Sequence, residues 1–268
     1  MIGQKENIQK LNIMKSNNAI PQLIIISGPR YSGKSSLMKE FANIIDANGI
    51  IEYIQPGVKA IRDMLTTNAL ATTNNKIYCI ENFESLSKQA QSSVLKTFEE
   101  TPKNCYFIIS TNNIDYMLDT ILSRGQLFTI ENYTQQELEE YCNKPELYNR
   151  FNTPSKIDYW RIKDLSELDK KISELQNLLY TKSTIECYNL INKYITFDIN
   201  SEGFYYLFFL EELDKNIKLN YKWKNEEQFI KYCTLLSEFY SKTNITTILQ
   251  DALLDKLVLN LHYLFQGV

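Results

Sequence analysis

The stretch ISGPRYSGKSSLMKEFANII, residues 26–45, contains the pattern GxxxxGK[ST] from Gly28 to Ser35. The apolar run QLIIIS, residues 22–27, precedes it, and apolar residues at helical spacing follow from Lys34 onward. A glycine-containing turn between a buried strand and a helix places backbone N–H groups and the positive end of the helix dipole around phosphate oxygens. The stretch therefore predicts a phosphate-binding loop at the end of a central strand.

We expect this loop to bind ATP together with Mg²⁺. Lys34 is expected to reach the β- and γ-phosphates, and the Ser35 hydroxyl to ligate the metal ion. Glu81 directly follows the apolar run IYCI, so it is expected at the end of a neighbouring strand as the second metal-binding group, where P-loop ATPases usually carry Asp. The predicted nucleotide-binding residues of the loop are Gly28, Pro29, Arg30, Tyr31, Ser32, Gly33, Lys34, Ser35 and Ser36.

Apolar runs typical of buried strands alternate with helical patterns over the first half of the chain. An N-terminal helix is expected around Ile8, Leu11 and Met14. This alternation predicts βαβ units, and hence an α/β domain with a mostly parallel sheet over residues 1–132. The expected strands are 22–27, 49–54, 75–82, 105–111 and 126–130, and further helices are expected from Lys34 and over 58–67 and 87–100.

The pattern changes near Tyr133, after which the helical period dominates. Pro154 is expected to interrupt it, and the later apolar residues are too many for isolated amphipathic helices, so most of them and His262 are expected in a core or an interface. Two helical modules, residues 133–194 and 195–268, are therefore predicted. The expected helices are 165–180, 183–194, 202–215, 226–242 and 246–265.

Charge is nearly balanced along the 268 residues. Residues 1–132 contain 13 Lys and Arg against 12 Asp and Glu, and residues 133–268 contain 16 against 20, which leaves a net charge of −3. Neither part has the strongly basic character of a protein that binds nucleic acid on its own. Any contact with DNA is expected to be local or shared with other chains.

Segments for membrane insertion or export are not expected. The chain lacks an uninterrupted run of about 18 apolar residues, the length that a membrane-spanning helix needs. Its first residues lack the apolar core of a signal peptide. The five cysteines are scattered without a CxxC pair, and His262 is the only histidine, so we expect buried thiols in the reducing cytoplasm rather than disulfides or a zinc site.

Four stretches together carry a resemblance to a known family. They are MIGQKENIQKLNIMKSNNAIPQLIIISGPRYSGKSSL, AIRDML, CIENFESLSKQAQSSVLKTFEETP and FIISTNNIDYMLDTILSRGQLF. In their order and spacing, which span most of residues 1–130, they resemble the AAA+ subunits of sliding-clamp loaders, of the DNA polymerase III delta-prime or gamma/tau type and related to replication factor C. The resemblance implies an AAA+ P-loop domain, a small helical lid domain over 133–194 and an all-α collar domain, used for oligomerisation, over 195–268.

The resemblance also implies roles for single residues. Asn112 would be sensor 1, placed to detect the γ-phosphate, and Arg124 would be the arginine finger that acts on the nucleotide of an adjacent subunit. AAA+ ATPases typically have a water-activating carboxylate after the metal-binding acid, but this chain has Asn82, whose amide cannot accept a proton at neutral pH. The predicted catalytic residues are therefore Arg124, Glu81 and Asn82, with weak or no hydrolysis by this chain.

Three further positions or segments depart from the family pattern, and the one at sensor 2, together with Asn82, favours a delta-prime-like subunit. Gly125 stands where the family has Cys. The stretch NTPSKIDYW resembles the sensor 2 neighbourhood, in which hydrolysing members place Arg, so Lys156 or Arg161 would have to serve here. The segment before AIRDML has no cysteine quartet, so the zinc module of bacterial gamma and delta-prime subunits is not expected.

The implied partners are other clamp-loader AAA+ subunits in a hetero-oligomer, the sliding clamp, and primer–template DNA. Arg62, Lys88 and Lys96 are candidates for phosphate contacts, although each could equally be an ordinary solvated side chain. Two alternatives remain, another AAA+ ATPase such as a helicase loader and a P-loop phosphotransferase. The phosphotransferase would need a lid with clustered arginines, whereas residues 133–268 contain only Arg150 and Arg161.

Overall fold

The computed structural model describes residues 3–54, 56–57, 75–161, 164–181, 185–186, 189, 205–243 and 250–266. The helix expected over 58–67, with Arg62, lies outside these ranges, and so do Cys187 and the boundary expected at 194/195. The chain forms two compact units, Met1–Arg161 and Ile162–Val268. The predicted three-domain division at 132 and 194 stays a prediction.

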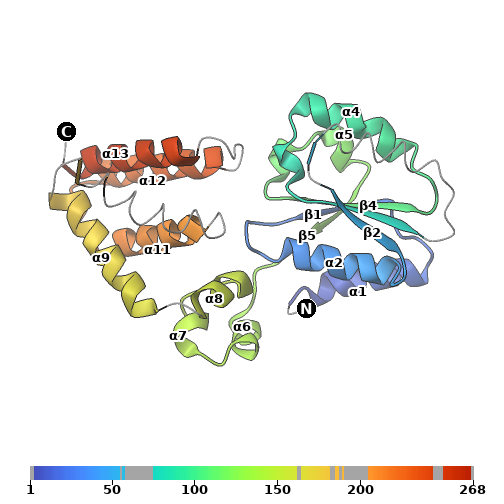
Figure 1. The fold of residues 1–268 in the computed structure, drawn as a ribbon, viewed down its shortest axis with the longest axis horizontal. Helices are drawn as coiled ribbons and strands as arrows, with labels where there is room; N and C mark the ends of the chain where they lie inside the picture. Colours follow the sequence, from blue (N-terminus) through green and yellow to red (C-terminus); the bar gives the residue numbers. More distant parts are fainter. Residues whose placement is uncertain are drawn as a thin grey trace. The chain divides into compact units, whose positions relative to one another are not determined.

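A five-stranded sheet forms the centre of the first unit (Figure 1). Its strands lie in the order β2-β3-β4-β1-β5, and every neighbouring pair is parallel, which confirms the predicted α/β fold. β1 is an interior strand that pairs on both sides, for example Leu23 with Phe107 of β4 and Ile24 with Gln126 of β5. The strands are β1 (Leu23–Ser27), β2 (Ile50–Ile54), β3 (Lys76–Ile80), β4 (Cys105–Thr111) and β5 (Gln126–Thr129).

Helices cover both faces of this sheet (Figure 1). Side chains alternate along β1, so Ile24 and Ile26 face α1 (Lys5–Ser16) and α2 (Lys34–Ile45), in a core with Leu11, Leu37 and Phe41. Leu23 and Ile25 belong to the opposite core, which α4 (Lys88–Glu99) and α5 (Asp119–Leu122) complete with Val94, Phe98 and Ile121. Burial on both faces explains why β1 reads as a continuous apolar run.

Three short helices end the first unit. Thr134 and Glu137 form a reciprocal capping box at the start of α6 (Gln135–Tyr141). The break expected around Pro154 is present, because residues 149–153 are not helical. Pro154 then begins α8 (Pro154–Arg161), a helix that was not predicted, at a position that needs no backbone N–H donor. α7 (Pro145–Tyr148) lies between these two helices in sequence and packs against both.

The described residues of the second unit are helical apart from short connections such as residues 221–225. Aromatic rings from several segments pack together around Phe265, whose ring lies within 6.2 Å, centroid to centroid, of those of Tyr180, Tyr221, Trp223 and Tyr232. His262 is buried, as expected. Within the described ranges, no helix combines the length and apolar character needed to cross a bilayer. The helices in the described ranges are α9 (Leu165–Thr181), α11 (Tyr205–Asn220), α12 (Glu226–Thr243) and α13 (Gln250–Gln266).

A substitution of Gly125 tests how tightly this position packs against Ile25 of β1. A Cβ atom at this position would lie 2.5 Å from Ile25 Cδ1 and 2.6 Å from Ile25 Cγ1, and Ile25 is fully buried. Gly125→Cys is therefore expected to lower the free energy of unfolding by about 1–3 kcal/mol, because overpacking forces side chains to shift. Denaturant titration of Gly125→Cys, Ile25→Val and the double variant measures this. Since Ile25→Val removes the nearest methyl, the double variant should lose less than the sum of the single variants, and strict additivity would contradict the clash.

Candidate functional site

The strand order brings three loops together at one edge of the sheet. β4 lies between β1 and β3, and all three strands are parallel. The phosphate loop follows β1, Glu81 and Asn82 follow β3, and Asn112 follows β4. The carboxyl edge of an open α/β sheet is where ligands bind in such folds. The predicted nucleotide-site residues from separate parts of the sequence therefore meet at one place.

The backbone of the phosphate loop favours glycine at the two glycine positions of the motif. Gly33 has a φ of 90° and precedes α2, and Tyr31 also has a positive φ of 62°. A Cβ atom at Gly28 would lie 2.9 Å from both Ile130 Cβ and Ser32 Oγ. The Ser32 hydroxyl donates to the Pro29 carbonyl at 2.7 Å. The loop is therefore tightly wound, with the amino end of α2 directed into the site.

Lys34 lies folded into this loop and is buried. Its ammonium group donates to the carbonyl oxygens of Gly28 at 2.9 Å and Pro29 at 2.6 Å, and to Asn112 Oδ1 at 2.7 Å. Burial lowers the pKa of Lys34 to about 8, and the neighbouring charge of Glu84 acts in the opposite direction. The loop thus holds a cation that three neutral oxygens only partly compensate, and an anion would relieve this.

Asn112 connects the phosphate loop to the loop after β3. Its side-chain amide donates to Asn82 Oδ1 at 3.1 Å while its own oxygen accepts from Lys34. Asn82 has a φ of 52° and begins the short 3-10 helix η1 (Phe83–Ser85). Asn is one of the few non-glycine residues that adopts this left-handed conformation readily. The same turn buries the Phe83 ring in the core.

Glu84 joins the site although the sequence patterns did not indicate it. Its Oε1 accepts from the backbone N–H of Asn112 at 3.1 Å and from Asn112 Nδ2 at 2.5 Å. Its Oε2 is buried and makes no hydrogen bond within the described part of the chain. The left-handed turn at Asn82 aims Glu84 back at the site. In the sequence, the only indication was an acidic residue three positions after Glu81, and that pattern is weak by itself.

Tyr133 was also missed as a site residue. Its hydroxyl donates to the Ser32 carbonyl at 3.0 Å and lies 2.7 Å from where a Cβ atom of Gly33 would be. Its ring would lie 2.9 Å from a Cβ atom added at Gly3. The next residue is Gln4, whose side chain donates to the Glu131 carbonyl and accepts from the Glu131 N–H. The Gly-Gln pair near the start of the chain therefore packs beside the phosphate loop.

The remaining phosphate-loop residues fit a nucleotide with Mg²⁺. Ser35 and Ser36 are exposed in the first turn of α2, where their hydroxyls are accessible. Glu81 directly follows β3 and is partly exposed. Arg30 and Glu81 are close enough to influence the charge of Lys34. A hydroxyl and a carboxylate are oxygen donors of the kind that Mg²⁺ prefers, so these residues suit the predicted ligands.

Arg124 lies outside this group and is engaged within the chain. Its guanidinium forms a salt bridge with Glu99 of α4 at 2.5 Å and donates to the Thr120 carbonyl at 2.6 Å. The side chain is 39% exposed, so solvent reaches one side of it. The structure therefore presents Arg124 at the surface, where Glu99 orients it.

The candidates for sensor 2 and for DNA contact make local interactions. Arg161 forms an ion pair with Asp158 at 3.6 Å and lies over the Tyr141 ring, whereas Lys156 Nζ donates to Asn152 at 3.4 Å. Lys88 donates to the Met117 carbonyl at 2.7 Å, so part of its hydrogen-bonding capacity is already used. Lys96 is exposed on α4 and pairs with Glu100 at 3.8 Å.

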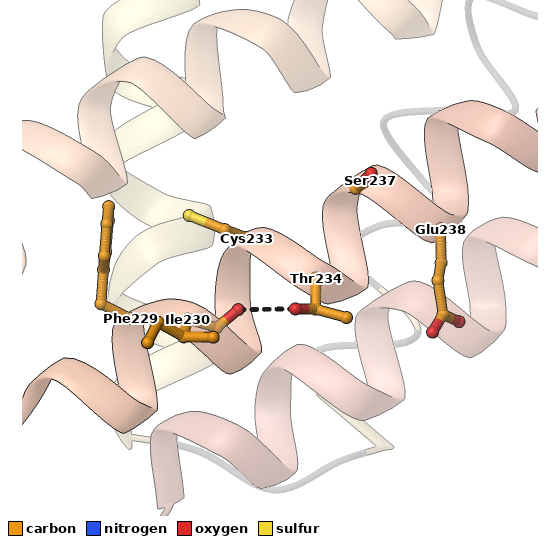
Figure 2. Close-up of a pocket in the computed structure, with 6 residues that line it drawn as sticks. All are labelled: Phe229, Ile230, Cys233, Thr234, Ser237 and Glu238. Carbon is orange, nitrogen blue, oxygen red and sulfur yellow. Dashed lines mark hydrogen bonds between the residues drawn. The ribbon is translucent and has the colours of Figure 1, made fainter.

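A separate recess lies on α12 in the second unit (Figure 2). It has a volume of about 400 Å³, and its one dashed interaction is the Thr234 hydroxyl donating to the Ile230 carbonyl within the helix. It contains none of the predicted nucleotide-binding residues. The recess is lined by Phe229, Ile230, Cys233, Thr234, Ser237 and Glu238.

Comparisons with known proteins find similarities in both sequence and structure. Residues 44–134 match the family described as DNA polymerase III, delta subunit. The chain is 28% identical to the DNA polymerase III subunit tau of Bacillus subtilis over 172 residues, which cover 54% of this chain and 31% of that protein. It is 26% identical to the replication factor C small subunit of Archaeoglobus fulgidus over 159 residues, covering 54% of this chain and 50% of that one.

A solved structure supports the fold over nearly the whole chain. A DNA polymerase III gamma subunit-related protein from Thermotoga maritima superposes with a TM-score of 0.57 at 16% identity, covering 94% of this chain and 97% of that one. The chain spans between about a third and a half of the curated relatives described above. In sequence, the chain is therefore similar to DNA polymerase III and replication factor C subunits, and it shares the fold of the gamma subunit-related protein.

Proposed function

We propose that this chain is a delta-prime-like subunit of a sliding-clamp loader, which binds ATP and Mg²⁺ and assembles with other AAA+ subunits. The observation that carries the proposal is a complete phosphate loop next to a strand end that lacks the water-activating carboxylate. Lys34 is buried in the loop, and the position beyond Glu81 is Asn82. Such a site binds a nucleotide but activates water poorly.

The roles of the loop residues follow from their chemistry. Lys34 exchanges its carbonyl partners, Gly28 and Pro29, for phosphate oxygens, while the backbone N–H groups at the start of α2 surround them. Ser35 and Glu81 hold the metal ion. Bound Mg·ATP places the negative charge of a γ-phosphate in the site, and this charge distinguishes the ATP-bound subunit from other nucleotide states. The site therefore serves assembly more than turnover.

The surface position of Arg124 supports a role between subunits. A guanidinium at 39% exposure, oriented by Glu99, is available to the nucleotide of a neighbouring AAA+ subunit. Such an arginine couples hydrolysis by the neighbour to correct assembly. In this proposal the loaded clamp and the primer–template DNA are partners of the whole complex, since the charge of this chain is nearly balanced.

A tagged pull-down from the native host, followed by mass spectrometry, tests the assignment. Recovery of other AAA+ loader subunits, a polymerase or a sliding clamp would support it. Recovery with a helicase, or of the chain alone, would contradict the clamp-loader assignment and favour a different AAA+ function.

Lys34→Ala is expected to weaken the binding of Mg·ATP by about 100-fold or more, because the only ammonium group inside the phosphate loop is removed. A direct calorimetric titration of the full chain measures this. Lys39→Ala is the matched control, since Lys39 lies exposed on the same helix. Equal affinities in Lys34→Ala and the unchanged chain would exclude the phosphate-loop assignment.

Arg124→Ala is expected to leave the affinity of this chain for ATP unchanged and to lower the ATPase rate of the reconstituted complex by about 10³-fold. Glu99→Ala removes the same salt bridge while keeping the guanidinium, and should retain most of the activity. A salt bridge that is only structural would make the two variants equally active. That result would remove the arginine-finger role.

A further inference from the structure

The side-chain amide of Asn112 has one orientation that satisfies its neighbours. An ammonium group only donates hydrogen bonds and a carboxylate only accepts them. Lys34 Nζ faces Asn112 Oδ1 at 2.7 Å, and Glu84 Oε1 faces Asn112 Nδ2 at 2.5 Å. Turning the amide over would place donor against donor at Lys34 and acceptor against acceptor at Glu84. Lys34 and Glu84 therefore fix the amide from opposite sides.

This orientation is unfavourable for a phosphate. The oxygen of the Asn112 amide points toward the phosphate loop, and a phosphate oxygen arriving there is also an acceptor. To donate to it, the amide must turn and give up its bond to Glu84. The bond that would be lost is charge-assisted, and its carboxylate would then face the amide oxygen. The loss of the Lys34 bond imposes no such penalty, because Lys34 itself moves to the phosphate.

The placement of the Glu84 carboxylate beside Asn112 is unfavourable for the stability of the fold. Its Oε2 is buried and makes no hydrogen bond among the described residues, whereas Oε1 has two donors, both from Asn112. An unsatisfied buried acceptor destabilises the fold. An acid at position 84 is thus explained better by its effect on Asn112 than by stability.

We propose that Glu84 is a positioning residue that limits nucleotide affinity: its carboxylate holds the Asn112 amide with the oxygen toward the phosphate loop and opposes the phosphate-donating orientation. The proposal rests on the proposed function, because it concerns the same nucleotide site. Glu84→Gln keeps an oxygen for the Asn112 N–H groups and adds an NH₂ that can donate to a turned amide. The variant therefore removes the constraint while conserving the shape of the side chain.

The test is a fluorescence titration of the full chain with a labelled, non-hydrolysable ATP analogue and Mg²⁺ at pH 7. Glu84→Gln is expected to bind the analogue about tenfold more tightly, close to the lower end of what one charge-assisted hydrogen bond contributes. Asp115→Asn is the matched control, because it removes one exposed acid from the loop after β4 without touching Asn112 or Lys34. This control should bind as the unchanged chain does.

An Asn112→Ala background separates positioning from simple charge repulsion. If Glu84 acts through the amide, Glu84→Gln should change the affinity less than about twofold in that background. The same gain in both backgrounds, an equal gain in Asp115→Asn, or weaker binding by Glu84→Gln would each overturn the proposal. Absence of binding by the unchanged chain would overturn nucleotide binding itself, and is therefore distinguishable from failure of the Glu84 role alone.

Discussion

The site depends on one buried cation. Lys34 is withdrawn from solvent, and its charge is met by two backbone carbonyls and one amide oxygen rather than by a direct carboxylate partner. Neutral oxygens solvate an ammonium group incompletely, which is why burial lowers the pKa of Lys34 to about 8. The phosphate loop, α2 and the ends of β3 and β4 are arranged around this charge. In the proposed function, a nucleotide phosphate supplies the negative partner that this ammonium group lacks.

The backbone turn at Asn82 bears both on the absence of a water-activating carboxylate at position 82 and on the presence of the Glu84 carboxylate in the site. With a φ of 52°, position 82 favours Asn over Glu, since a longer side chain gains no local hydrogen bond to offset the left-handed backbone. The same turn places Phe83 in the core and returns Glu84 to the site beside Asn112. One backbone conformation therefore both disfavours a carboxylate at position 82 and introduces one at position 84.

Patterns in the sequence predicted the elements better than the contacts between them. β1, β3 and β4 were predictable because burial on both faces makes them continuously apolar, and the phosphate loop because its glycines are fixed in spacing. α8 was missed because Pro154 indicates a break as readily as a helix start. Glu84 was missed because its place depends on a single left-handed residue, Asn82. The hydrophobic periodicity of the sequence does not indicate where such a turn occurs.

A nucleotide that is held and hydrolysed slowly changes the stability of the subunit as well as its assembly. A ligand that binds only the folded state stabilises it by mass action, by about 4 kcal/mol when its free concentration is 1,000 times its Kd. That amount is comparable to a large part of the stability of a typical domain. Tyr133 connects the phosphate loop to the segment just before α1, and Lys34 connects it to the loop after β4. In the proposed function, bound nucleotide therefore acts as a structural component of the surface that neighbouring subunits contact.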